Sequence, residues 1–155
     1  MGDRRDVKMT LQTDDPPIYF YTHFGGKDLP ETVRSILDKP EVRHRWDDPP
    51  YLARIIFCGM IKSSCIKEKG IRDLPETIEA SVVPILNFKI FDGTTGFGIS
   101  LHKARDAEYP PVEIYCPAQT VTIFEYTTSF DEFTQMESAL WQMKMSDIYE
   151  QVSGS

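Results

Sequence analysis

An apolar run over residues 52–61 constrains the fold of this chain more than any other stretch. The run follows Asp48, a residue type suited to cap a helix N-terminus, and two prolines, Pro49 and Pro50. Proline is tolerated in a first helical turn because its missing N–H would have had no partner there. Since only Arg54 interrupts the apolar character, the sequence predicts a buried central helix over about residues 49–63.

Further helices are predicted by capping boxes, in which a polar residue is followed three positions later by glutamate. The first box is Asp-Leu-Pro-Glu at 28–31, and the helix that it opens should end at Pro40. A second box, Ser-Phe-Asp-Glu at 129–132, predicts a final helix. Residues 73–76 nearly repeat the first box and predict a short additional helix.

Segments rich in strand-forming residues alternate with these helices. Strands are predicted over residues 18–21, 85–91, 97–101, 112–116 and 121–126. Asp92-Gly93 is a strong turn signal and predicts a hairpin between the second and third of them. The predicted class is α+β, with a largely antiparallel sheet of about four to five strands packed against three to four helices.

The length of 155 residues predicts a single domain, which we place over residues 18–145. Residues 1–17 are mostly polar and charged and are expected to form a flexible N-terminal arm. Residues 146–155 are expected to form a C-terminal tail.

The charge balance narrows the possible partners. The chain has 24 acidic and 17 basic residues, for a formal net charge of −7, which argues against direct nucleic-acid binding. There is neither a run of about 20 apolar residues nor a signal peptide, so no membrane association is expected. Three cysteines without C-x-x-C spacing favour a reducing, cytoplasmic setting.

Polar residues at the start of the central helix form the first candidate site. Arg54, in an otherwise apolar helix, needs a carboxylate partner or a polar cavity. Either Asp47 or Asp48 supplies that partner in an internal ion pair, or Arg54 lines a pocket. In the pocket alternative Arg45 and Arg54 hold an anionic ligand, and a flat group of that ligand stacks on an aromatic ring, Trp46 or Tyr51.

Two glycine-containing segments are further candidates. His23 precedes Gly25-Gly26, where backbone N–H groups could meet an anion, or where glycine could simply permit a positive φ. Thr94 and Thr95 lie in a glycine-rich stretch that either approaches a ligand or forms a bulged hairpin. The three histidines match no metal motif, so neither a metal nor a cofactor is expected.

Three stretches together resemble a family of short uncharacterised proteins from bacteria and bacteriophages. They are Tyr-Thr-His-Phe-Gly-Gly at 21–26, the stretch from Arg45 to Cys58, and Thr-Gly-Phe-Gly-Ile-Ser at 95–100. The family has no established activity, so the resemblance implies no catalytic residue. It implies a prokaryotic or viral origin and a self-contained accessory domain, located in the cytoplasm of a bacterial host cell. Residues 66–92 would be an elaboration of this chain.

The leading hypothesis is a non-enzymatic protein that sequesters a small anionic or nucleotide-derived ligand, with counter-defence as the task that the phage association suggests. The expected ligand-binding residues are His23, Arg45, Trp46, Tyr51, Arg54, Thr94 and Thr95.

Two alternatives belong to other classes. An acidic inhibitor would block the basic nucleic-acid-binding site of a host protein through Glu125, Asp131, Glu132 and Glu137. A small nucleotide-acting enzyme would use His23 as acid or base and Arg54 on a phosphate.

Overall fold

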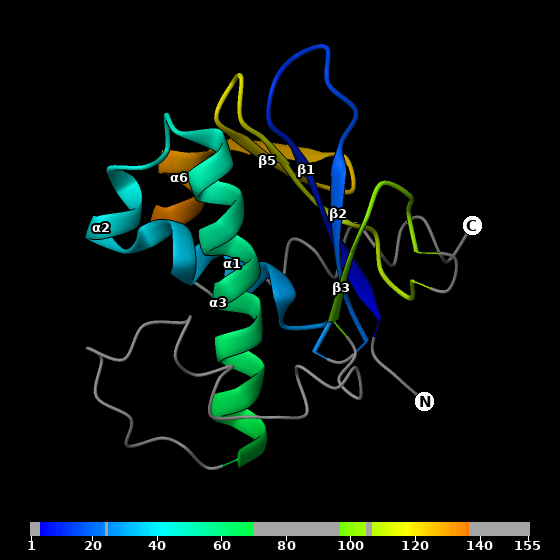
Figure 1. Cartoon of the computed structure of the whole chain (residues 1–155). Helices are drawn as coiled ribbons and strands as arrows, with labels where there is room; N and C mark the ends of the chain where they lie inside the picture. Colours follow the sequence, from blue (N-terminus) through cyan, green and yellow to red (C-terminus); the bar gives the residue numbers. More distant parts are fainter. Residues whose placement is uncertain (1–3, 24, 70–96, 105–106, 137–155) are drawn as a thin grey trace.

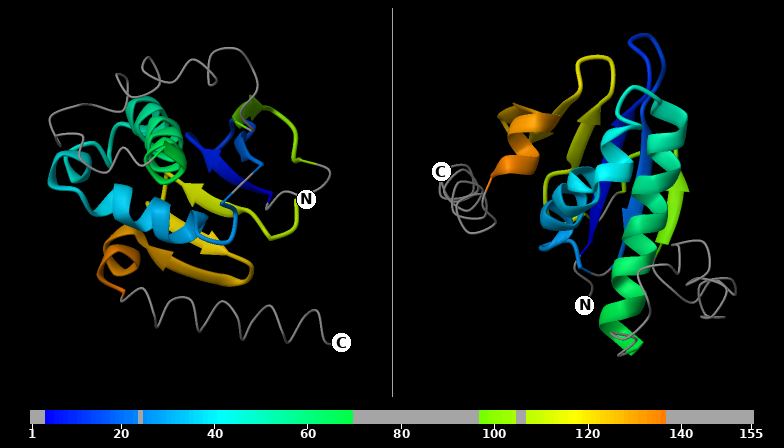
Figure 2. Two further views of the ribbon diagram at one scale, coloured as in Figure 1. Left: turned by 90° about the horizontal axis from the view of Figure 1, so that it is seen from below. Right: turned by 90° about the vertical axis from the view of Figure 1, so that its left-hand side faces the viewer.

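A mixed β-sheet with helices gathered on one of its faces organises the chain (Figure 1; Figure 2). The computed structural model describes residues 4–23, 25–69, 97–104 and 107–136. Its strands are β1 (Arg5–Thr10), β2 (Ile18–Thr22), β3 (Phe97–Ser100), β4 (Val112–Tyr115), β5 (Thr120–Ile123) and β6 (Tyr126–Ser129). Its helices are α1 (Leu29–Asp38), α2 (Pro40–Arg43), α3 (Pro49–Lys69) and α6 (Phe130–Gln135).

The six strands of the described residues lie in the order β3-β2-β1-β4-β5-β6. The β1–β4 pair is parallel and the other four pairs are antiparallel. The predicted α+β class is therefore confirmed, with a mostly antiparallel sheet that has more strands than expected.

One additional strand is β1, which occupies part of the expected flexible arm. That expectation is wrong for residues 5–10, because Val7 and Met9 are fully buried in the core and the strand pairs on both sides. The charged residues Arg5 and Asp6, which suggested a solvated arm, are themselves only 3% and 2% exposed.

The other additional strand is β6, which begins at Tyr126, the last residue of the single strand predicted over residues 121–126, and ends at Ser129. The chain reverses after β5 at Phe124, whose φ of 62° is unusual for a residue other than glycine. No Asn-Gly or Asp-Gly pair marks this turn, so the sequence carried no hairpin signal.

Successive side chains of a strand point to opposite faces of the sheet, and the apolar ones point to the face that the helices cover. The core therefore lies between the sheet and the helices. Val7, Phe20, Ile114 and similar residues face the helices, where they meet the buried residues of α1 and α3. Gly59 in α3 allows close packing on α1, because a Cβ there would clash with the side chain of Ile36.

The helix boundaries follow the predicted signals with one correction. Ser129 caps α6 as the capping box predicts, since its Oγ accepts a 3.1 Å hydrogen bond from the Glu132 backbone N–H. The box at 28–31 is wrong: Asp28 has helical backbone angles and makes no side-chain cap hydrogen bond. Glu31 instead accepts two hydrogen bonds from the Arg34 guanidinium, at 2.8 and 2.6 Å.

Helix α3 begins where the sequence indicated and extends beyond the predicted end. It is not buried on all sides: Leu52 and Ile56 are fully buried, whereas Tyr51 and Arg54 are exposed. No helix of the described residues is long and apolar enough to cross a membrane.

Candidate functional site

Three of the predicted ligand-binding residues come together at the start of α3: Arg45, Tyr51 and Arg54. A turn between α2 and α3 carries Arg45, and it is fixed by backbone hydrogen bonds from Arg45 N–H to the Val42 carbonyl (2.8 Å) and from Asp48 N–H to the Arg45 carbonyl (3.0 Å). This turn leads into the first turn of α3, which carries Tyr51.

Both guanidinium groups lie over the Tyr51 ring. The guanidinium carbon of Arg45 is 4.3 Å from the ring centroid and that of Arg54 is 4.8 Å from it. The two carbons are consequently no more than about 9 Å apart. All three side chains are exposed, so the arrangement is a surface cluster rather than an enclosed pocket. We refer to Arg45, Tyr51 and Arg54 as the arginine–tyrosine cluster.

Arg54 does not occupy the buried position expected for it. It is exposed, because it lies one turn from Tyr51 on the outer side of α3. The expected ion pair with Asp47 or Asp48 is absent from the described residues, where Asp48 pairs with Arg45 at 3.5 Å instead. Arg54 is therefore an exposed cation without an ion pair among the described residues.

Trp46 is a packing residue rather than a stacking platform for a ligand. Its indole Nε1 donates to the Leu37 carbonyl at 3.2 Å, and its ring meets the Phe130 ring edge-on with centroids 5.4 Å apart. The Arg43 guanidinium lies over the ring, 4.9 Å from its centroid. These contacts join the turn before α3 to α1 and α6.

His23 lies at the opposite end of the sheet from the cluster. It follows β2, whose last residue, Thr22, pairs with Arg5 at the start of β1. The cluster lies near the other end of β1. The carbonyl of Trp46, next to Arg45, accepts a hydrogen bond from the side chain of Gln119. Gln119 belongs to the turn after β4, and this turn contacts the end of β1 through a hydrogen bond from Cys116 N–H to the Thr10 carbonyl. Six strand residues, each rising about 3.3 Å, separate the two ends.

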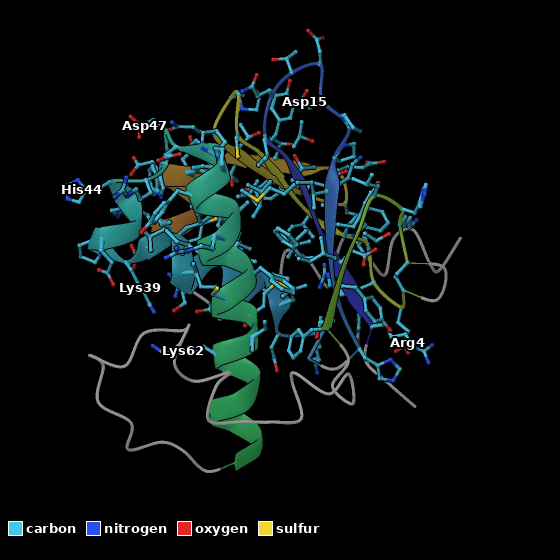
Figure 3. The ribbon with its side chains drawn as sticks, in the orientation of Figure 1. Arg4, Asp15, Lys39, His44, Asp47 and Lys62 are labelled. Carbon is cyan, nitrogen blue, oxygen red and sulfur yellow. The ribbon has the colours of Figure 1, made fainter. Side chains whose placement is uncertain are left out.

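Figure 3 shows this separation through Asp47, next to the cluster, and Arg4, next to His23. His23 Nδ1 accepts from Arg4 Nε at 3.2 Å and lies 2.9 Å from the Tyr21 hydroxyl. His23 and Arg54 therefore do not form one site, which removes the geometry on which the enzyme alternative depended. Thr94 and Thr95 lie outside the described residues.

The glycine segment serves a structural purpose. Gly25 has a φ of 78°, so of the two interpretations the turn is the one observed. The Gly26 carbonyl accepts a 3.1 Å hydrogen bond from the buried Arg5 guanidinium. Arg5 Nε also donates to the Pro110 carbonyl at 2.7 Å, and its guanidinium lies over the Tyr109 ring.

Sequence reasoning did not identify Asp6 as a notable residue. Its Oδ2 accepts a 2.9 Å hydrogen bond from the Ala104 backbone N–H, whereas its buried Oδ1 has no hydrogen-bond partner among the described residues. Burial raises the pKa of Asp6, opposed by the Ala104 hydrogen bond and by the charge of Lys103. The alternation of apolar Val7 and Met9 with polar residues was the signal in the sequence that residues 5–10 form a strand.

Two cysteines lie among the described side chains. Cys116 is buried, and desolvation raises the pKa of its thiol to about 11, so the side chain is a protonated core residue. Cys58 in α3 is half-buried. Within the described ranges, no group of three His, Cys, Asp or Glu residues is placed to hold a metal ion.

Comparison of the chain with protein-family models, with curated proteins and with solved structures finds no match. The candidate site is therefore defined by its geometry alone.

Proposed function

We propose that this chain binds a small anionic ligand, a nucleotide or nucleotide-derived molecule, through the arginine–tyrosine cluster. The observation that carries the proposal is the pair of exposed guanidinium groups on the ring of Tyr51. A guanidinium stacked on an aromatic ring keeps its N–H donors at the edge of the plane, where they can hold phosphate oxygens.

The charges around the cluster favour a phosphate-bearing ligand. Arg45 forms an ion pair with Asp48 at 3.5 Å on an exposed surface, where an ion pair contributes little to stability and leaves the arginine available to a ligand. Arg54 has no ion pair within the described part of the chain. Guanidinium groups stay protonated in proteins, so they bind negative charge but do not serve as acids or bases. The cluster thus supports capture rather than turnover.

The net charge of −7 favours a small anion over a nucleic acid. A long polyanion would bring many charges close to a chain that is negatively charged overall, whereas a nucleotide places a few phosphate oxygens on the two arginines. A hydrogen bond to a charged group contributes about 1.5–3 kcal/mol. Two such contacts on an open surface give an affinity in the micromolar to millimolar range.

The test is a thermal-shift panel of nucleoside mono-, di- and triphosphates and inorganic phosphate, repeated with Arg54→Met. A ligand at about 100 times its Kd adds roughly 2.7 kcal/mol of stability, which raises the Tm by several degrees. We expect a nucleotide to raise the Tm of the wild-type protein, and Arg54→Met to reduce the affinity about tenfold or more.

Lys39→Met is the matched control, because Lys39 is an exposed cation beyond the end of α1 and its loss changes the net charge equally. Equal weakening by Arg54→Met and Lys39→Met would show that binding depends on overall charge, and the proposal would fail. It would also fail if no nucleotide shifted the Tm of the folded wild-type protein.

A further inference from the structure

The face of the sheet opposite the helices carries a hollow of about 380 Å³ that is separate from the arginine–tyrosine cluster. Its lining residues come from three adjacent strands: Lys8, Thr10, Glu113, Ile114, Tyr115, Thr120 and Thr122. The volume is within the range of small-molecule sites, about 300–1,000 Å³. Unlike most such sites, this one is lined mainly by hydroxyl and charged groups.

Strand register arranges six of these side chains in two rows across β1, β4 and β5. One row is Lys8, Glu113 and Thr122, and the other is Thr10, Tyr115 and Thr120. Neighbouring strands lie about 4.8 Å apart and alternate residues of one strand about 6.7 Å apart. The two rows therefore cover about 10 by 7 Å, an area that one or two sugar rings occupy.

The charges in the hollow cancel locally. Lys8 Nζ and Glu113 Oε1 lie 3.1 Å apart, with about a third of each side chain exposed. The hydrogen bond that Lys8 donates to the Glu113 carboxylate raises the pKa of Lys8, so the ammonium stays protonated at neutral pH. A neutral pair attracts anions weakly, but it offers donors and an acceptor side by side to hydroxyl groups.

Free hydroxyl groups surround this pair. Thr10, Tyr115 and Thr120 make no side-chain hydrogen bond within the described residues, and Thr122 shares one with Thr127 at 2.8 Å. All of these lining side chains are half-buried, so they remain accessible to a ligand. Each hydroxyl can both donate and accept, and the Tyr115 ring adds an apolar surface on which a sugar ring can rest.

We propose that this hollow binds an uncharged polyhydroxylated ligand, namely a sugar ring. Two sources share that chemistry: a free saccharide and the ribose of a nucleoside. In the first row, Glu113 accepts hydrogen bonds from ligand hydroxyls and Lys8 donates to them. In the second row, Thr10 and Thr120 form further hydrogen bonds with the ligand. This ligand is uncharged, whereas the ligand proposed for the arginine–tyrosine cluster is an anion, so either proposal can fail without the other.

The test follows backbone amide chemical shifts by NMR while the protein is titrated with either of two probes. One arm uses methyl glycosides of common hexoses, and the other uses adenosine with 2′-deoxyadenosine as its comparison. We expect saturable shifts in β1, β4 and β5 with millimolar affinity in at least one arm. A response to the glycosides identifies a saccharide site, and a response to adenosine that 2′-deoxyadenosine lacks identifies a ribose site.

Two variants remove one hydrogen-bonding group each: Thr120→Val keeps the branched shape, and Glu113→Gln keeps the length. Each should weaken binding about fivefold, the effect of one hydrogen bond. Thr13→Val, in the exposed loop between β1 and β2, is the matched control and should leave binding unchanged. Absence of saturable shifts in both arms would overturn the proposal. Equal binding of adenosine and 2′-deoxyadenosine with no response to the glycosides would overturn it too, as would shifts that neither variant reduces.

Discussion

Arginine occurs at both ends of the sheet, and the two ends use it differently. At the start of β1, Arg5 is 3% exposed and its guanidinium is held by the carbonyls of Pro110 and Gly26. At the start of α3, Arg54 is exposed and contacts only the Tyr51 ring within the described residues. An arginine's partners, rather than its sequence context, separate the structural role of Arg5 from the binding role that we propose for Arg54.

The largest expected effect is the loss of Arg5. Arg5→Met should lower the free energy of unfolding by about 3 kcal/mol, because the buried Gly26 carbonyl and the part-buried Pro110 carbonyl lose a charged donor. Denaturant unfolding measures this value. A loss no greater than that of Arg54→Met would remove the distinction between the two ends.

Asp6 is expected to show a smaller effect that depends on pH. Because burial raises its pKa in the folded state, its contribution to stability is fully present below its unfolded pKa and is lost as pH rises through its folded pKa. At neutral pH Asp6→Asn should therefore be more stable than the wild type by about 1 kcal/mol, because the amide oxygen can still accept from Ala104 and no charge is buried.

Denaturant unfolding of Asp6→Asn and wild type from acidic to neutral pH measures this difference. It should shrink towards acid, where Asp6 is protonated in both states. Asp14→Asn, in the exposed loop after β1, controls for net charge. A difference that is constant across the pH range would contradict the expected titration of Asp6.

His23 should affect stability but not ligand binding. His23→Ala removes the acceptor of the Arg4 Nε hydrogen bond and should cost about 1 kcal/mol. Its affinity for the nucleotide that binds wild type should be unchanged, because His23 lies at the end of the sheet away from the cluster. Isothermal titration calorimetry measures that affinity, and a tenfold loss would show that His23 contributes to ligand binding.

The smallest expected effect on stability is that of Arg54→Met. An exposed cation contributes little to folding, so its free energy of unfolding should stay within about 0.5 kcal/mol of the wild-type value. Denaturant unfolding decides this, and a loss of several kcal/mol would show that Arg54 is a structural residue after all.

Helix positions were predictable because the signals that set them are local. Pro40 ends α1, Ser129 caps α6, and the prolines before Tyr51 mark the start of α3. Strand β1 was not predictable, because the partners of its buried charges, such as the carbonyls of Gly26 and Pro110, come from distant parts of the chain.

The candidate site was predicted only in part, because helix spacing is a local property whereas solvent exposure depends on the whole fold. Sequence spacing placed Tyr51 and Arg54 on one side of α3, which the structure bears out. It could not show that this side faces solvent, because Ile55 and Cys58, which lie near Tyr51 and Arg54 along α3, are apolar in sequence. Nor could it separate Trp46, which packs on Phe130, from Tyr51, which does not face the core.

Ligand binding at the arginine–tyrosine cluster is best tested by mapping backbone amide chemical shifts while the wild-type protein is titrated with ATP. We expect saturable shifts concentrated in residues 45–55, around the cluster. Shifts concentrated instead in residues 4–8 and 23–27, around Arg5 and His23, would contradict it, as would the absence of any saturable shift.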